Sequence, residues 1–214
     1  MDLIIQHTSN RWFRYAEFAL LFILLPALMY FELLGKRFII PLVISLIYCL
    51  SILLLDKEFD RTRLGWNQFK GTKPVLLRFA AFAIVSTILV AIFFPERLFD
   101  LPQEQPGLML LIWIFYPLWS VLPQEVIFRP FFFHRYEDLF PSQNFLILIN
   151  AICFGFVHII FGNWIAVVGT ILISLLLAWQ YDKHRSLMGV SLEHALFGNW
   201  VFTVGLGSFF YYVG

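Results

Sequence analysis

The polar residues with the clearest chemical potential lie inside apolar segments. Glu125 and Arg129 are four residues apart in the run PQEVIFR (residues 123–129), so on a helix they share one face. His158 and His194 lie in two later apolar segments. A carboxylate or an imidazole can take a proton from water, and an imidazole or an amide can donate to an oxyanion. These side chains could therefore activate water, provided that the fold brings them together.

The composition of the whole chain is typical of a protein in an apolar solvent. Of its 214 residues, 60% are hydrophobic and only 14% are charged, and the mean hydropathy is +0.80. Apolar windows recur at close to the roughly 20 residues that a helix needs to cross a bilayer. Only helices and closed barrels satisfy their backbone in lipid, and these runs are too long for barrel strands. The sequence predicts an all-α, polytopic membrane bundle of seven or eight helices, with residues 1–214 as one integral-membrane domain.

The expected spans follow the apolar windows. They are residues 16–34, 38–55, 75–94, 108–136, 145–161 and 164–179, and one or two more within 187–213, split near Gly198 or Gly205. The fourth contains Pro117 and Pro123 and is expected to be long and bent. Residues 35–37 should form a short turn. The start of the chain lacks the pattern of a signal peptide, so the first helix is expected to be retained.

Basic residues predict the orientation, because Lys and Arg gather in short cytoplasmic loops. Three lie on one side of the expected bundle (Lys36, Arg37 and Arg97), and eleven lie on the side of the N-terminus: Arg11, Arg14, Lys57, Arg61, Arg63, Lys70, Lys73, Arg78, Arg135, Lys183 and Arg185. This distribution predicts a cytoplasmic N-terminus. Another group is interpreted as anchors at the membrane interface: Phe132, Phe133, His134 and Arg135.

Each candidate residue also has a structural interpretation. Glu125 and Arg129 could form an intrahelical ion pair, and His158 and His194 could be hydrogen-bonded between helices. Ionisable side chains cost about 2.5 to 3.5 kcal/mol on insertion into a membrane, so their presence in three segments favours a common purpose. We expect Glu125, Arg129, His158 and His194 to line a shared polar cavity.

Signatures of other peptidases are missing from the sequence. It has no His-Glu-x-x-His zinc motif and no Gly-x-Ser-Gly run, and GLGS (205–208) stands where an aspartyl enzyme needs Gly-x-Gly-Asp. Cys49 and Cys153 lie in separate expected spans, so they offer no paired zinc-ligand spacing. No cofactor is expected, although Glu125, His158 and His194 could alternatively hold zinc.

The order of the polar residues resembles the CPBP intramembrane proteases, also called the Abi or type II CAAX prenyl protease group. That family carries Glu-Glu-x-x-x-Arg, then Phe-x-x-x-His, then His-x-x-x-Asn on successive helices of an eight-span bundle. The matching runs here are QEVIFR (124–129), FGFVH (154–158) and HALFGN (194–199). The resemblance covers about residues 108–210, and the ordered set of three is more specific than any one motif.

The resemblance implies a glutamate-dependent endopeptidase that hydrolyses a peptide bond near the membrane. It implies that the first Glu and the His of the second motif polarise a water, that the His and Asn of the third hold the oxyanion, and that Arg129 steadies the acids. The expected partners are the lipid bilayer and a peptide or membrane-anchored protein, with no nucleic acid. Many bacterial members are linked to bacteriocin processing or self-immunity, which implies the cytoplasmic membrane of a prokaryote.

The first motif departs from the family pattern at Gln124. An amide can orient a water but cannot accept its proton. Glu125 is therefore the expected proton acceptor, with His158 positioning the water and His194 donating to the oxyanion. Neighbouring helical positions point about 100° apart, so Glu125 needs a rearrangement to act at the place of residue 124. The alternative is a pseudoprotease that binds a peptide, a lipidated tail or a partner helix without cutting it.

The third motif departs as well, because Gly198 stands four residues after His194 and Asn199 stands five after it. Five residues overshoot the helix face that four residues restore. Asn199 can join the site only if Gly198 permits a bulge of the π type. Otherwise Asn199 is a hydrogen bonder between helices, and the sequence leaves both options open.

Overall fold

The structure is a computed structural model that describes residues 10–34, 39–66, 69 and 71–211. Within these ranges the backbone forms helices joined by turns and contains no strand, which confirms the all-α class. Among the described residues, five helices are long and apolar enough to cross a membrane: Arg11–Tyr30, Thr72–Phe93, Pro106–Leu139, Gln143–Phe161 and Trp164–His184. Together with the high mean hydropathy, they identify an integral multi-pass membrane protein.

The described region contains two further long helices, α4 and α12. Helix α4 (Ile39–Leu55) is apolar but has only 17 residues. Helix α12 (Leu187–Val204) has 18 residues and carries the polar residues Glu193 and His194. The long helices in the described ranges match the lower of the two predicted numbers, while the number that crosses a bilayer stays a prediction.

The first helix differs most from its predicted bounds of 16–34. It consists of α2 (Arg11–Ala19), a π-helical turn (Leu20–Leu24) and α3 (Leu25–Tyr30). It begins earlier because the Asn10 side chain accepts a hydrogen bond from the backbone N–H of Trp12 and caps the helix. The turn predicted at residues 35–37 lies outside the described residues.

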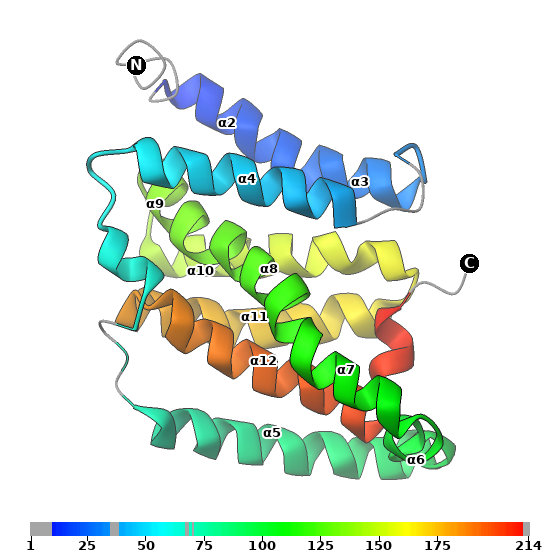
Figure 1. Cartoon of the computed structure of the whole chain (residues 1–214). Coiled ribbons are helices and arrows are strands. Elements are labelled where there is room, and N and C mark those ends of the chain that lie inside the picture. Colours follow the sequence, from blue (N-terminus) through cyan, green and yellow to red (C-terminus); the bar gives the residue numbers. More distant parts are fainter. Residues whose placement is uncertain (1–9, 35–38, 67–68, 70, 212–214) are drawn as a thin grey trace.

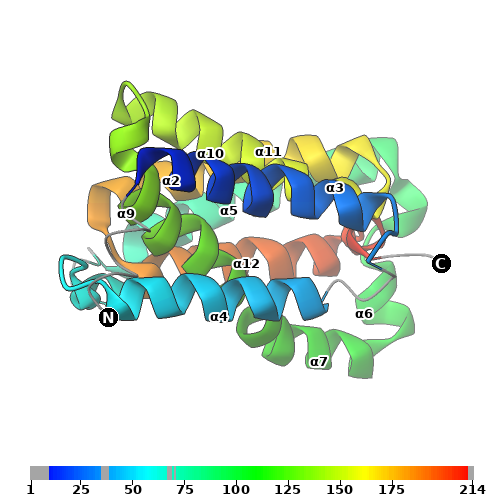
Figure 2. The same cartoon turned by 90° about the horizontal axis from the view of Figure 1, so that it is seen from above.

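Figures 1 and 2 show how the helices are arranged. Helices α2, α3 and α4 lie along one side of the molecule, and α5 (Thr72–Phe93) lies along the opposite side in Figure 1. Between them lie α10 (Gln143–Val157), α11 (Trp164–His184) and α12, with α10 packed against α11 and α5 against α12. The helix that contains the PQEVIFR run begins beside α6 (Asp100–Glu104) and crosses to the opposite end. It packs against α12 near its start and against α4 further along.

This crossing helix has two π-helical turns, Pro117–Val121 and Ile127–Phe131, which separate α7 (Pro106–Tyr116), α8 (Leu122–Val126) and α9 (Phe132–Tyr136). Pro123 and Pro130 have no N–H for the bond to the fourth preceding residue, and their rings crowd that residue's carbonyl group. The wider turns accommodate both effects. The predicted long helix is confirmed, and Glu125 lies between its two distortions.

The last long helix resolves the ambiguity at Gly198 and Gly205. Helix α12 runs through Gly198 without a break and ends at Gly205, whose φ of 106° is in the left-handed region. A Cβ atom at Gly205 would also lie 1.9 Å from the backbone oxygen of Arg97. Residues Gly207–Phe210 then form a short 3-10 turn. The described part of 187–213 therefore contains one long helix rather than two short ones.

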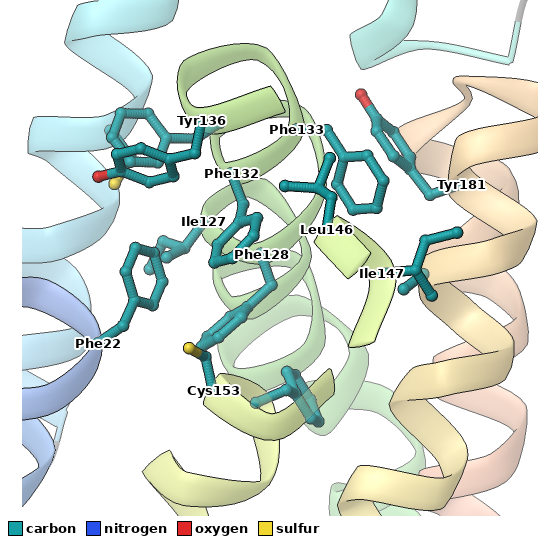
Figure 3. Packing of buried hydrophobic residues seen from close by; sticks show 14 of the residues in the cluster. Phe22, Ile127, Phe128, Phe132, Phe133, Tyr136, Leu146, Ile147, Cys153 and Tyr181 are labelled. Carbon is teal, nitrogen blue, oxygen red and sulfur yellow. The ribbon is translucent and has the colours of Figure 1, made fainter. Parts of the chain in front are cut away.

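An aromatic core surrounds α9. Figure 3 shows Phe128 and Phe132 between Phe22 of the first helix and Leu146 of α10. The Phe22 ring meets both edge-on, with centroids 5.3 Å from Phe128 and 5.0 Å from Phe132. Such pairs add to the free energy gained from burial alone. The crossing helix is thereby fixed against the first helix on one side and α10 on the other.

The interpretation of Phe132, Phe133 and Arg135 as interface anchors is wrong. Both phenylalanines are 0% exposed, and Arg135 is buried because its Nε donates to Glu17 Oε2 of α2 at 2.8 Å. Aromatic and basic residues are typical of a membrane interface, but a carboxylate from another helix permits burial of the arginine. The first helix supplies that carboxylate, which the sequence pattern around residue 135 does not reveal.

Candidate active site

Glu125 and Arg129 form an ion pair at the centre of the bundle, where both are 0% exposed. Arg129 Nε donates to Glu125 Oε2 at 2.9 Å, as their spacing of four residues predicts. The same guanidinium donates to Asn150 of α10 and, at 3.2 Å, to Ser174 Oγ of α11. Arg129 thereby joins three helices, and its buried charge is fully matched.

The other oxygen of Glu125 holds His194. His194 Nδ1 lies 2.8 Å from Glu125 Oε1, which links α12 to α8. A carboxylate can only accept a hydrogen bond, so the proton of this bond lies on Nδ1 and the neutral imidazole carries its lone pair on Nε2. The Tyr116 hydroxyl lies 3.3 Å from that Nε2. A carboxylate thus orients an imidazole whose second nitrogen is a proton acceptor.

A cavity of about 300 Å³ lies beside this imidazole. It is lined mainly by aromatic and aliphatic side chains, and its polar lining residues are Tyr116, Ser120, Gln124, His158, Thr170 and His194. Such a mixture of apolar walls with a few polar groups is typical of small ligand sites. Its volume is at the lower end of the range of about 300 to 1,000 Å³ that is usual for such sites.

His158 reaches the same cavity from the end of α10. It begins a 3-10 turn (His158–Phe161), and its Nδ1 donates to the backbone oxygen of Phe154 at 2.6 Å. Its Nε2 is therefore also an acceptor. The Phe154 ring contacts both imidazoles, with centroids 4.9 Å from His158 and 5.6 Å from His194. The structure thus brings two imidazoles from separate helices to one cavity.

Gln124 and Glu125 occupy different surroundings. Gln124 lines the cavity, and its Nε2 donates to Ser120 Oγ at 2.8 Å, while its Oε1 has no hydrogen-bond partner within the described part of the chain. Glu125 and Arg129 do not line this cavity, contrary to the expectation from the sequence. Glu125 points about 100° away from Gln124 because neighbouring helical residues do so. Together with Arg129 it faces α10, α11 and α12 instead.

The bulge considered for Asn199 is not formed. Helix α12 keeps its regular hydrogen bonding through Gly198, and Asn199 Nδ2 donates to the backbone oxygen of Trp113 at 3.3 Å. Asn199 is not among the residues that line the cavity, whereas Gly198 is. Of the two options, the structure therefore has Asn199 as a hydrogen bonder between helices.

Tyr116 is a residue of this site that the sequence reasoning missed. It lies on α7, before the first matching motif, and only the crossing of α7 over α12 brings it to His194. The one hint in the sequence is Gly198, because a missing side chain at that place leaves space for another group. A tyrosine within an apolar helix is too common to be singled out from that hint.

The side chains around Glu125 are already bonded to one another. Among the described residues, no group of three His, Cys, Asp or Glu side chains could hold a metal ion. Both oxygens of Glu125 are hydrogen-bonded, one of them to an arginine, so a zinc site on Glu125, His158 and His194 would require that pair to separate. As placed, the Nε2 atoms of His158 and His194 can accept hydrogen bonds from a water. The Glu125 carboxylate can balance the positive charge that His194 acquires when it takes a proton.

The comparisons with known proteins agree with the family resemblance found in the sequence. The family model for type II CAAX prenyl endopeptidases of the Rce1-like kind matches residues 106–212, which is half of the chain. The match begins at the first residue of α7 and includes the crossing helix, α10, α11 and α12. Searches of curated proteins and of solved structures gave no match.

Proposed function

Because the chain belongs to the Rce1-like family of type II CAAX prenyl endopeptidases, we propose that it hydrolyses a peptide bond of a membrane-anchored substrate in the cavity beside His194. The family is a protease family, and cleavage by this member is the proposal. The observation that supports it most is the 2.8 Å contact between Glu125 and His194, since the same imidazole lines a cavity of about 300 Å³.

In the proposed reaction, a water donates one proton as a hydrogen bond to His158 Nε2, which positions it, and His194 Nε2 takes the other proton. The water oxygen bonds to the carbonyl carbon, and an oxyanion forms. The carbon–nitrogen bond then breaks, and the proton on His194 passes to the leaving amine, giving a carboxylic acid and an amine. Glu125 stabilises the imidazolium and holds the proton on Nδ1 of His194, so that Nε2 is the nitrogen that accepts a proton. A carboxylate has this role in other carboxylate–histidine pairs.

These roles differ from the sequence-based assignment in two respects. Glu125 acts through His194 rather than on the water, because its two oxygens are already bonded to Arg129 and His194. His194 becomes the proton acceptor rather than an oxyanion donor, because its cavity-facing nitrogen has no proton in the neutral state. The role proposed for His158, positioning the water, is unchanged.

The rival proposal is a pseudoprotease that binds a peptide or a lipidated tail, and Gln124 in the cavity is the observation in its favour. The test is cleavage of membrane-anchored peptides in liposomes by wild type, Glu125→Ala, His194→Ala and Gln124→Glu. Cleavage by wild type that both alanine variants lose supports the enzyme. Cleavage by Gln124→Glu alone would indicate a disabled catalyst and favour the binding protein.

The same preparation tests the zinc alternative. Wild-type protein is treated with a chelator and its metal content is measured. Under the proposed mechanism, cleavage is unchanged after this treatment. Stoichiometric zinc whose removal abolishes cleavage, and whose return restores it, would replace the proposed mechanism with a metallopeptidase. The location in a prokaryotic cytoplasmic membrane belongs to the same proposal and is tested by assays in native membranes.

A further inference from the structure

Tyr116 lies where the proposed reaction needs a hydrogen-bond donor. It is the last residue of α7, directly before the π-helical turn at Pro117–Val121, and it lines the same cavity as His158 and His194. Its hydroxyl lies 3.3 Å from His194 Nε2, a long distance for a hydrogen bond between a hydroxyl and a nitrogen. A contact of that length is easily exchanged for a shorter one when a ligand enters.

The Tyr116 ring fills the space that a side chain at position 198 would occupy. A Cβ atom built at Gly198 would lie 2.3 Å from the Tyr116 hydroxyl oxygen and 2.4 Å from a ring carbon. Gly198 is four residues after His194, so a side chain there would point to the same face of α12 as the imidazole. The absence of a side chain at residue 198 therefore leaves the space beside His194 to the phenol of Tyr116, which comes from another helix.

Most other polar groups around His194 cannot donate a hydrogen bond to the cavity, because they are acceptors there or already donate to another partner. His194 and His158 each offer a lone pair to the cavity, because their Nδ1 protons are held by Glu125 and by the Phe154 carbonyl. The amide N–H of Gln124 donates to Ser120, and Asn199 donates to Trp113. An oxyanion formed next to His194 requires a donor, and the Tyr116 hydroxyl is the group that contacts His194 from the cavity.

Building on the proposed function, we propose that Tyr116 is a catalytic residue whose hydroxyl donates a hydrogen bond to the oxyanion of the tetrahedral intermediate. In the free protein the hydroxyl donates to His194 Nε2 and keeps that lone pair directed at the cavity. When a substrate carbonyl enters, the hydroxyl turns to its oxygen and a water takes its place at Nε2. The tyrosine keeps its proton throughout, so the proton balance of the reaction is unchanged.

The test begins with Tyr116→Phe, which removes the hydroxyl and keeps the ring. We expect kcat to fall by about 10²- to 10³-fold, the usual loss for one oxyanion donor, while KM changes by less than about threefold. The control is Tyr181→Phe, which removes a hydroxyl from a buried tyrosine of α11 outside the cavity. Its kcat should equal that of wild type. A kcat of Tyr116→Phe equal to that of wild type would overturn the proposal and leave the proposed function standing.

A positional swap separates hydrogen-bond donation from packing. Gly198→Asn alone should abolish cleavage, because its side chain collides with the Tyr116 ring. In Tyr116→Ala the ring is gone, and adding Gly198→Asn places an amide donor beside His194. We expect the double variant to cleave at least about tenfold faster than Tyr116→Ala. Failure of the swap to raise kcat would assign the effect of Tyr116 to packing and overturn the proposal.

These comparisons do not depend on which group accepts the proton. If Gln124→Glu cleaves and wild type does not, the proposed function is wrong for the natural chain. The Tyr116 variants are then compared in the Gln124→Glu background, where the same loss and the same recovery are expected. If neither protein cleaves any membrane-anchored peptide tested, no oxyanion forms and both proposals are overturned.

Discussion

Glu125 and Gln124 are neighbours with opposite surroundings, and this difference decides what each can do. Glu125 is enclosed, with one oxygen on Arg129 and the other on His194, so its charge is matched and it has no access to water. Gln124 faces the cavity and presents an unpaired oxygen to it. A buried carboxylate that holds an imidazole can still raise the rate, because it stabilises the charge that the imidazole acquires. In the proposed mechanism the reaction centre is therefore a pair, Glu125 with His194.

Glu125→Gln tests the role of the carboxylate. We expect kcat to fall by about 10³- to 10⁴-fold with KM nearly unchanged, because an amide neither stabilises the imidazolium nor fixes the position of its proton. The matched control is Ser174→Ala, which also removes a partner of Arg129 but does not touch His194. This control should lose about 1 kcal/mol of stability and keep its kcat. Equal kcat losses in both variants, measured with purified protein, would reduce Glu125 to a structural role.

Much of this site could be predicted from the residue types and their order. The sequence identified Glu125, Arg129, His158 and His194 as exceptions in an apolar chain, and the structure links Glu125 to Arg129 and His194 and places both histidines at one cavity. It could not predict which of Gln124 and Glu125 faces the cavity, because that depends on the rotation of the helix between two π-helical turns. Tyr116 was missed because its role arises from a crossing of helices, which leaves no local signal.

At the element scale, close contact between α10 and α11 positions His158. Gly155 lies three residues before His158, and a Cβ there would be 2.9 Å from the Val167 backbone oxygen and 2.2 Å from an Ile171 side-chain carbon. Only a residue without a side chain allows the two helices to approach so closely. The same contact fixes the end of α10, from which His158 enters the cavity.

Gly155→Ala should push α10 and α11 apart. We expect a loss of about 1–3 kcal/mol in stability, the usual cost of overpacking, together with lower kcat because His158 shifts. Gly169→Ala on α11 is the control, since a Cβ there meets nothing within 4 Å. That variant should be neutral or up to about 1 kcal/mol more stable, because alanine favours a helix. Thermal unfolding in detergent measures both, and equal effects would show that the close contact has no energetic importance.

A second element contact holds α5 against α12 beside the site. Arg78 donates to both oxygens of the buried Glu193, at 2.5 and 2.9 Å. Arg78→Ala should cost about 1–3 kcal/mol, because it leaves a buried carboxylate without its partner. Lys73→Ala removes an exposed cation from the same helix and should change stability by less than about 0.5 kcal/mol. No difference between the two in thermal unfolding would mean that Glu193 is neutralised by another group.

At the scale of the whole molecule, hydropathy determined the class and most of the helices, because lipid requires every spanning backbone to be helical. The second, third, fifth and sixth predicted spans have counterparts in the structure, with ends that differ by a few residues, as 164–179 against Trp164–His184 shows. Helix ends depend on caps such as Asn10 and Gly205, which act locally and which hydropathy does not register. The buried Glu17–Arg135 pair could not be predicted, because its partners are separated by most of the chain.

The orientation prediction concerns the whole molecule. In Figure 1 the start of α2, the segment between α4 and α5, and the α11–α12 connection lie at one end, and this end carries most of the basic residues named above. A cytoplasmic N-terminus places that end inside the cell. With Cys49 and Cys153 replaced by alanine, Glu58→Cys should resist a membrane-impermeant thiol reagent in intact cells, whereas Glu96→Cys should react. The reverse labelling pattern would invert the topology.

The central claim is that Glu125 contributes to hydrolysis through His194, and a double-mutant cycle tests it most directly. The measurement is kcat/KM of Glu125→Gln, His194→Gln and the double variant on one membrane-anchored peptide in liposomes. Residues that act as a unit are strongly non-additive, so the double variant should be no slower than His194→Gln within a factor of about three. If the two losses multiply instead, Glu125 and His194 act independently and the proposed pair is not the centre of the reaction.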